Sequence, residues 1–250
     1  MLNESDGKIT SQAVNAAFSK LVTLCIDRNL FHVLDGKHSE PFAILGAQYP
    51  THVERFASSL FGITACGACL VAYSTTNSKT KLWIPRRAKH LYSFPGLLDV
   101  TVAGGVKART SPFETVVAEA EEEASLSPSF VRANVRAVGA LTCMSLTGED
   151  WPGEKGLVLP DVLYVYDLEL PKDVYPRPND EEVEGFQSMN VEEVQHALLT
   201  KQFKPDAAIV LIDFFIRHGI ITADNEKDFV EIIMHLHRQL PFPTKSSRCL

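Results

Sequence analysis

The chain has 250 residues, of which 45% are hydrophobic and 22% are charged, and its formal net charge is −7. Such a chain can form one large domain, or a small and a medium one, around an ordinary apolar core. A net negative charge without a basic stripe argues against nucleic-acid binding. The sequence has neither an apolar run long enough to cross a membrane nor an N-terminal signal pattern. We therefore expect no membrane contact and a cytoplasmic location.

Cysteine usage agrees with that location. The five cysteines are odd in number and scattered, as in a reduced intracellular protein. Cys66 and Cys69 form a C-x-x-C pair, but they fall in an apolar run predicted as a strand, where residues i and i+3 face opposite sides. The pair is therefore weak evidence for a zinc or redox site.

Residues 1–61 are predicted to form a small N-terminal α/β domain, because apolar residues recur there first at helical spacing and then in short runs. The predicted elements are a helix over 13–25, strands over 31–34 and 42–45, a turn at Asp35 and Gly36, and a helix over 52–60. No residue of this domain carries chemistry that the sequence identifies.

Residues 62–243 are predicted to form a larger α/β domain, followed by a frayed tail at 244–250. Runs of β-branched, aromatic and aliphatic residues alternate with polar turns, and helical periodicity follows them. The predicted strands cover 63–73, 81–87, 135–144, 162–170 and 181–189, with a further strand leading into Gly104 and Gly105. The predicted C-terminal helices cover 191–199, 205–218 and 229–240.

Within this domain, residues 101–126 (TVAGGVKARTSPFETVVAEAEEEASL) read as a glycine loop followed by a helix. Ser111 and Glu114 have the spacing of a capping box, with Pro112 at the first helical position. We expect the helix to run to about Ala124.

Carboxylates crowd the far end of this helix. Glu119, Glu122 and Glu123 are spaced i, i+3 and i+4, so they project from one face. With Glu121 they lie where the helix dipole favours positive charge, at a cost of ~0.3–1 kcal/mol for each. Clustered carboxylates are ligands that Mg²⁺ prefers, usually together with substrate phosphates. The alternative is a solvated acidic helix face.

Two further groups of charged residues are candidates for the same site. Arg86 and Arg87 end a predicted strand shortly before the glycine loop, so either could bind a phosphate, or each could pair with a surface acid. Glu182 or Glu184 could supply an additional carboxylate from the start of the last predicted strand.

The loop and helix resemble the Nudix box, G-x5-E-x7-R-E-U-x-E-E-x-G-U, in which U is aliphatic. Gly104, Glu119, Glu122, Glu123 and Leu126 match the first glycine, the glutamate after the arginine, the paired glutamates and the last aliphatic position.

Three positions depart from the box: Thr110 replaces the first glutamate, Ala118 the arginine and Ser125 the second glycine. In the family that first glutamate and the arginine form a supporting pair around the catalytic glutamate. Loss of such support typically costs ~10–100-fold in affinity or activity. The departures favour an attenuated or repurposed site, and the alternative is a scaffold that binds a diphosphate without turnover.

Other segments are similar to the thiamine pyrophosphokinase-related Nudix hydrolases of fungi and plants, in which Ser125 is usual. They cover 83–87 (WIPRR), 94–99 (FPGLLD), 165–171 (VYDLELP), 203–206 (FKPD), 211–219 and 236–243. The resemblance implies a Nudix α/β/α sandwich with a mixed sheet, preceded by a fused small α/β domain. It also implies hydrolysis of oxidised or damaged thiamine diphosphate-like compounds to the monophosphate, with Mg²⁺, or alternatively Mn²⁺, as cofactor.

The resemblance assigns the site as follows. Glu119, Glu122 and Glu123 would be catalytic and would bind the metal, with Glu182 as a weaker fourth ligand. Gly104 and Gly105 would let the backbone approach the substrate, and Arg86 or Arg87 would neutralise phosphate charge.

One departure concerns the substrate. Cys66, Cys69, Val71 and Val100 stand where the subfamily tends to have an aromatic, a histidine and asparagines. If these positions line the pocket, it is more apolar here, and hydrogen-bonded discrimination is weakened. A prenyl or other apolar diphosphate is therefore the alternative substrate. The sequence does not indicate an oligomeric state.

Overall fold

A mixed sheet lies at the centre of the computed structural model, which describes residues 8–34, 40–149 and 151–245. Within these residues the sheet has six strands in the order β6-β7-β3-β4-β8, and β5 also pairs with β3. The pairing of β3 with β7 is parallel and the other pairings are antiparallel. The strands are β3 (Ala65–Thr76), β4 (Lys79–Arg87), β5 (Val102–Gly105), β6 (Arg136–Leu146), β7 (Val158–Glu169) and β8 (Val183–Asn190).

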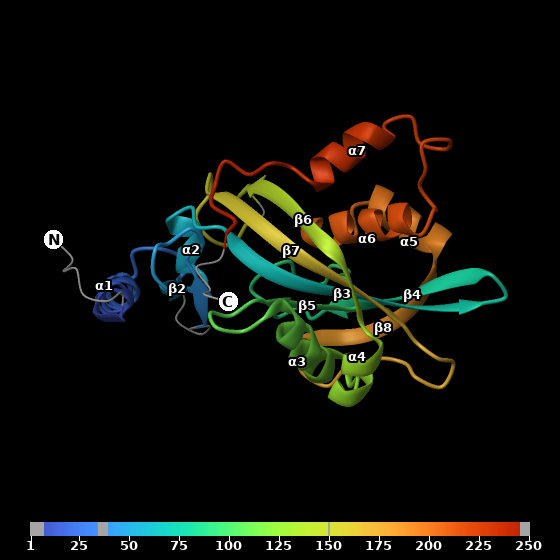
Figure 1. The fold of residues 1–250 in the computed structure, drawn as a ribbon, viewed down its shortest axis with the longest axis horizontal. Helices are drawn as coiled ribbons and strands as arrows, with labels where there is room; N and C mark the ends of the chain where they lie inside the picture. The colour runs from blue at the N-terminus through green and yellow to red at the C-terminus, as the bar shows by residue number, and fades with distance from the viewer. Residues whose placement is uncertain (1–7, 35–39, 150, 246–250) are drawn as a thin grey trace.

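Helices cover both faces of this sheet (Figure 1). On one face lie α3 (Pro112–Ala124) and α4 (Pro128–Asn134), and on the other α5 (Val191–Leu199), α6 (Pro205–Arg217) and α7 (Phe229–Leu236). The predicted α/β/α sandwich is therefore confirmed. None of the helices within the described residues combines the length and apolar character that a membrane crossing requires.

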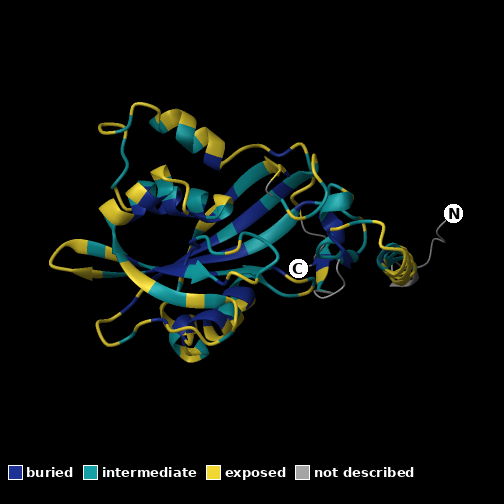
Figure 2. Cartoon of the chain, turned by 180° about the vertical axis from the view of Figure 1, so that it is seen from behind, coloured by how far each residue is buried: buried dark blue, intermediate teal, exposed yellow. Residues whose placement is uncertain are grey.

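The central strand β3 explains why the sheet is buried on both sides. Alternate residues along it belong to two apolar clusters, with Cys69 and Val71 facing α6, and Ala68 and Leu70 facing α3. A strand covered on both faces reads as a continuous apolar run, and Figure 2 shows the middle of the sheet as the most buried part of the chain. Cys66 packs against the α3 cluster and Cys69 belongs to the other, so the prediction that they face opposite sides is confirmed.

The N-terminal residues form a small unit with its own core at one end of the molecule (Figure 1). It consists of α1 (Lys8–Asp27), β1 (Pro41–Ala43), β2 (His52–Glu54) and α2 (Ala57–Leu60). The buried residues of that core are Val22, Val33, Leu34, Val53 and Ala57. The strands β1 and β2 pair as a separate antiparallel sheet.

Several local predictions in this unit are wrong. Residues 31–34 form a turn closed by a hydrogen bond from the Leu34 N–H to the Phe31 carbonyl, although Val33 and Leu34 are buried like strand residues. Residues 52–54 form β2 rather than the start of a helix, because they pair with β1 and bury Val53. The predicted turn at Asp35 and Gly36 lies outside the described residues, as does residue 246 onward of the predicted tail.

The larger domain contains one helix, α4, that is absent from the predicted elements. The sequence after Leu126 gives α4, which begins with a hydrogen bond from the Phe130 N–H to the Ser127 hydroxyl and has Pro128 in its first turn. Serine followed by proline is a helix-start signal, so this element was recognisable. The last helix is shorter than predicted, because α7 ends at Leu236 and not at residue 240.

Candidate active site

The helix α3 and the strand β5 together position the predicted carboxylates. The Ser111 hydroxyl accepts a 3.1 Å hydrogen bond from the Glu114 N–H, and Pro112 begins the helix, as predicted. The reciprocal half of the capping box is replaced, because the Glu114 carboxylate accepts a 2.7 Å hydrogen bond from Arg132 of α4 instead. The helix ends at Ala124, which confirms the predicted boundary.

Two of the three glutamates lie against the end of β5. The Glu123 side chain is buried, and its carboxylate accepts a 3.1 Å hydrogen bond from the Ala103 N–H. Glu119 lies over Gly104, where a Cβ atom would stand 2.3 Å from the Glu119 Oε1 atom. Only glycine leaves room for the glutamate at that point. Glu122 is exposed at the edge of the same group.

Burial and mutual repulsion make negative charge costly on these side chains. Burial, followed by the charge of Glu122, raises the pKa of Glu119 to about 7. Burial and then the charge of Glu119 raise the pKa of Glu123 well above its ordinary value, although the hydrogen bond from Ala103 opposes this. A cation beside these carboxylates would stabilise their charged forms.

The donor set fits a hard divalent cation. Glu119, Glu122 and Glu123 offer only carboxylate oxygens, which suit Mg²⁺ or Mn²⁺. In the part of the chain that the structure describes, no three His, Cys, Asp or Glu side chains are arranged so that they could hold a metal as they stand. Mg²⁺ usually takes one or two protein carboxylates and completes its shell with water and phosphate oxygens. The exposed Glu122 can turn towards such an ion without repacking the core.

Glu182 and Glu184 have different relations to this group. Both are exposed, and Glu184 lies on β8. The charge of Glu182 contributes to raising the pKa of Glu119 and of Glu123, so Glu182 lies within electrostatic reach of both. Of the two acids proposed as an additional ligand, Glu182 is the one that the fold brings near the site.

The two arginines have separate structural roles. Arg87 donates hydrogen bonds to the backbone carbonyls of Ser93 (3.0 Å) and Phe94 (3.3 Å), and it pairs with Asp99 at 3.2 Å. Its guanidinium is therefore occupied in holding the loop before β5. Arg86 donates one hydrogen bond, of 2.8 Å, to the Gly96 carbonyl. Arg86 thus keeps more donors available for a phosphate than Arg87 does.

A second buried charged group, which the sequence analysis missed, lies on the α6 side of the sheet. The Lys204 Nζ atom is 2.8 Å from Asp206 and 3.6 Å from Asp99. Burial, then the charge of Asp206, raises the pKa of Asp161 on β7 to about 7. Lys204 and Asp206 belong to the segment 203–206 that resembles the subfamily. No local sequence pattern indicates that they lie beside Asp99, which is distant in sequence.

Three of the four substituted positions behind the apolar-pocket hypothesis are buried, whereas Cys66 is partly exposed. Cys69, Val71 and Val100 are 3%, 0% and 1% exposed, and all three belong to the core cluster beneath α6. They pack against neighbouring side chains and do not form an open wall.

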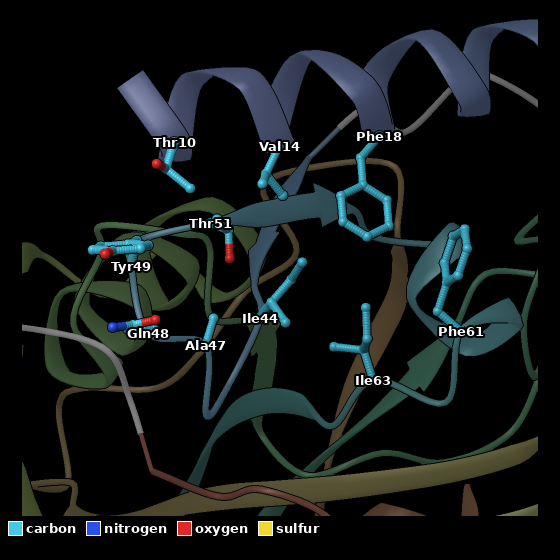
Figure 3. Close-up of a pocket in the computed structure, with 10 residues that line it drawn as sticks. All are labelled: Thr10, Val14, Phe18, Ile44, Ala47, Gln48, Tyr49, Thr51, Phe61 and Ile63. Atoms are coloured by element: carbon cyan, nitrogen blue, oxygen red, sulfur yellow. The ribbon is translucent and has the colours of Figure 1, made fainter. Parts of the chain in front are cut away.

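A pocket of about 450 Å³ lies elsewhere, between α1 and the β1–β2 hairpin (Figure 3). Val14 and Phe18 of α1 point towards Ile44, Phe61 and Ile63 across it. None of the α3 carboxylates lines this pocket. It belongs to the N-terminal unit and not to the candidate active site.

Comparison with known proteins identifies the family. Residues 68–213, which contain β5, α3 and all three glutamates, match the model of the NUDIX domain. The chain belongs to the NUDIX family.

Relatives and solved structures agree with this assignment. The chain is 38% identical over 216 residues to the uncharacterized protein YJR142W of Saccharomyces cerevisiae, covering 84% of this chain and 63% of that protein. It is 35% identical to the chloroplastic Nudix hydrolase 20 of Arabidopsis thaliana, covering 69% of this chain and 44% of the relative. The chain thus spans about half to two thirds of the length of these relatives. The crystal structure of DR0079 from Deinococcus radiodurans has the same fold, with a TM-score of 0.51 at 21% identity, covering 68% of this chain and 95% of that one.

The structure shows how one departure from the NUDIX box is accommodated. Ser125 follows α3 with φ 54° and ψ 26°, in the left-handed region where the general box has glycine. Its hydroxyl donates a 3.0 Å hydrogen bond to the Arg177 carbonyl, which ties the helix end to the loop before β8. Ala118 is exposed on α3, and the Thr110 N–H bonds to the Lys107 carbonyl.

The raised pKa of Glu119 predicts how pH affects the metal-free NUDIX protein. Because the folded-state pKa of about 7 lies above the ordinary glutamate value of 4.5, folding favours the protonated form. That contribution to stability is fully present below pH ~4.5 and is lost as pH rises through ~7. We expect Glu119→Gln to reduce the loss of unfolding free energy between pH 5 and pH 8, measured by urea denaturation in EDTA. A loss as large as that of the wild type would contradict the assignment of this titration to Glu119.

Proposed function

We propose that this chain is a Mg²⁺-dependent hydrolase that cleaves an organic diphosphate into the monophosphate and phosphate. The observation that carries the proposal is the group of NUDIX-box glutamates at the end of α3, two of which pack against β5 although burial disfavours their charge. A bound divalent cation would stabilise the charged forms of these buried carboxylates.

Each residue has a stated part. Glu122 and Glu123 would hold the ion, and Glu119 would either join them or accept the proton of the attacking water. The ion, when bound, lowers the pKa of water and polarises phosphate oxygens. Water adds to the terminal phosphorus, the bridging P–O bond breaks, and the monophosphate leaves as inorganic phosphate forms. Gly104 keeps space for Glu119, and Arg86 would neutralise charge on the diphosphate.

Thiamine diphosphate-like compounds, including oxidised or damaged forms, are the favoured substrates. Similarity to the thiamine pyrophosphokinase-related subfamily supports this choice. It is further supported by Asp161, whose half-buried carboxylate accepts no hydrogen bond from the described residues. A positively charged ring of the thiamine type would neutralise such a carboxylate, whereas a prenyl chain would not.

A panel of diphosphates tests both parts of the proposal. Phosphate release is measured from thiamine, oxythiamine and farnesyl diphosphates, with Mg²⁺ or with EDTA, for the wild type, Glu122→Gln and Asp161→Asn. We expect release only with Mg²⁺, strong reduction in Glu122→Gln, and a raised KM for the thiamine compound alone in Asp161→Asn. Preference for farnesyl diphosphate would reject the thiamine class. Binding of all three without turnover would identify a non-catalytic scaffold.

The proposal includes a cytoplasmic location, as the cysteine usage suggests. Two relatives are named as chloroplastic proteins, so localisation of the tagged full-length protein is the direct test.

A further inference from the structure

The loop between β5 and α3 is held by the N-terminal unit. The Ala108 N–H donates a 2.7 Å hydrogen bond to the Pro41 carbonyl, and Phe42 forms an antiparallel bridge with Lys107. The Phe42 ring lies over Gly105, where a Cβ atom would stand 2.5 Å from the ring. The strand β1 thus fits against the glycine loop directly beside the α3 carboxylates.

This contact presents one carboxylate of the N-terminal unit to the loop. Glu40, which immediately precedes β1, places its Oε1 atom 2.7 Å from the Lys107 Nζ atom. Its other oxygen lies 3.3 Å from the Arg55 guanidinium, and the Arg55 N–H donates to the Glu40 carbonyl. Arg55 in turn lies over the Phe42 ring. One carboxylate oxygen of Glu40 therefore binds Arg55 and the other binds Lys107, so Arg55 orients the carboxylate that holds the Lys107 ammonium group.

Lys107 lies within electrostatic reach of the α3 carboxylates while it is bound to this anchor. Its hydrogen bond to Glu40 is the largest contribution that raises the pKa of Lys107, and the charges of Glu119 and Glu122 raise it further. Its side chain is 47% exposed. An ammonium group has three donors, and Glu40 uses one of them, so others remain for a ligand that enters at the carboxylates.

We propose that the N-terminal unit completes the active site, with Glu40 as the positioning residue that holds the Lys107 ammonium beside Glu119 and Glu122, where Lys107 binds the diphosphate of the substrate. The inference rests on the proposed function for the identity of the ligand. It assigns a role to residues 40–55, which lie outside the segment that matches the NUDIX model.

A purely structural ion pair is the competing explanation, and the two differ in what Glu40 does. If Glu40 acts only by positioning Lys107, its removal has no effect once the lysine is gone. If the pair merely joins the two units, loss of either residue lowers stability and leaves diphosphate affinity unchanged.

Binding of methylenediphosphonate, a diphosphate that cannot be hydrolysed, separates these explanations. Its affinity is measured by calorimetry at fixed Mg²⁺ for the full chain and for Glu40→Gln, Lys107→Met, the double variant and Lys107→Arg. A charge-assisted hydrogen bond is worth ~1.5–3 kcal/mol, or roughly 10–100-fold in affinity. We therefore expect Lys107→Met to bind at least ~10-fold more weakly, Glu40→Gln to bind more weakly by a smaller factor, and the double variant to equal Lys107→Met. Lys107→Arg should retain most of the affinity.

The control is Lys155→Met, which removes an exposed ion pair with Glu149 and should leave affinity unchanged. Thermal unfolding of each variant shows that it is folded. Three results would each overturn the inference. Lys107→Met could bind methylenediphosphonate as tightly as the wild type, or Lys107→Arg could lose as much affinity as Lys107→Met. The double variant could also bind more weakly than Lys107→Met by the full factor that Glu40→Gln loses alone. Lys107-dependent binding without phosphate release from any diphosphate would support it while rejecting the proposed function.

Discussion

Glu123→Gln is expected to lower Mg²⁺-dependent diphosphate hydrolysis by about 10³-fold, the scale of several kcal/mol of transition-state stabilisation. The same change should stabilise the metal-free protein at pH 8. Burial raises the pKa of Glu123 well above its ordinary value, so folding at pH 8 must either protonate the group or bury its charge. Glutamine is isosteric, uncharged, and can still accept the hydrogen bond from the Ala103 N–H.

The opposite signs of these two effects make the test specific. Hydrolysis rates and urea unfolding in EDTA are compared for the wild type, Glu123→Gln and Glu121→Gln, which changes an exposed glutamate of the same helix. Glu121→Gln should behave as the wild type. If Glu123→Gln had a lower unfolding free energy than the wild type in EDTA, the Glu123 carboxylate would stabilise the fold itself. That result would contradict its assignment as a metal ligand.

Gly104→Ala is expected to reduce hydrolysis by about 10²-fold, the loss that a displacement of ~1 Å can cause in a catalytic group. A Cβ atom at residue 104 would stand 2.3 Å from the Glu119 Oε1 atom and 2.4 Å from its Cγ and Cδ atoms. Those atoms belong to a flexible side chain, so Glu119 moves while the backbone stays in place. Unfolding free energy should therefore change by less than about 1 kcal/mol.

Gly185→Ala provides the matched control, because Gly185 is also a strand glycine and nothing lies within 4 Å of a Cβ atom there. Activity and urea unfolding are measured for both variants. Unchanged activity in Gly104→Ala would remove Glu119 from the mechanism. A large loss of stability would instead indicate that the glycine is needed by the sheet.

The carboxylate cluster could be predicted because the residues that define it lie within one short segment of the sequence. Ser111, Pro112 and the spacing of the glutamates define α3 within a few turns, and Gly104 follows from the box pattern. Helix caps and side-chain periodicity act over three or four residues. The structure confirms the predicted start and end of the helix, and Val116, Val117 and Ala120 are buried along it.

Residues that depend on tertiary contacts could not be assigned in the same way. The sequence does not distinguish Arg87 from Arg86, yet in the fold Arg87 binds Asp99 and the backbone carbonyls of Ser93 and Phe94. Glu40 has no sequence signal, because its contact with Lys107 exists only when β1 lies against the loop. Long-range pairing of this kind is fixed by packing and not by local propensity.

The N-terminal unit shows the same limit for secondary structure. Short apolar runs do not distinguish a buried turn from a strand by periodicity. Residues 31–34 bury Val33 and Leu34 in a turn, held partly by the Glu154 carboxylate, which accepts hydrogen bonds from the His32 and Val33 N–H groups. Because Glu154 is distant in sequence, no local pattern near residue 33 indicates this contact.

Divalent-cation binding tests the central claim most directly. Mn²⁺ is titrated into the full chain and followed by water-proton relaxation, with Mg²⁺ as competitor, for the wild type and for the combined Glu119→Gln, Glu122→Gln and Glu123→Gln variant. We predict that the wild type binds Mn²⁺ in competition with Mg²⁺ and that the folded triple variant does not. Equal binding by both proteins would show that the ion, and the chemistry assigned to it, does not depend on the α3 carboxylates.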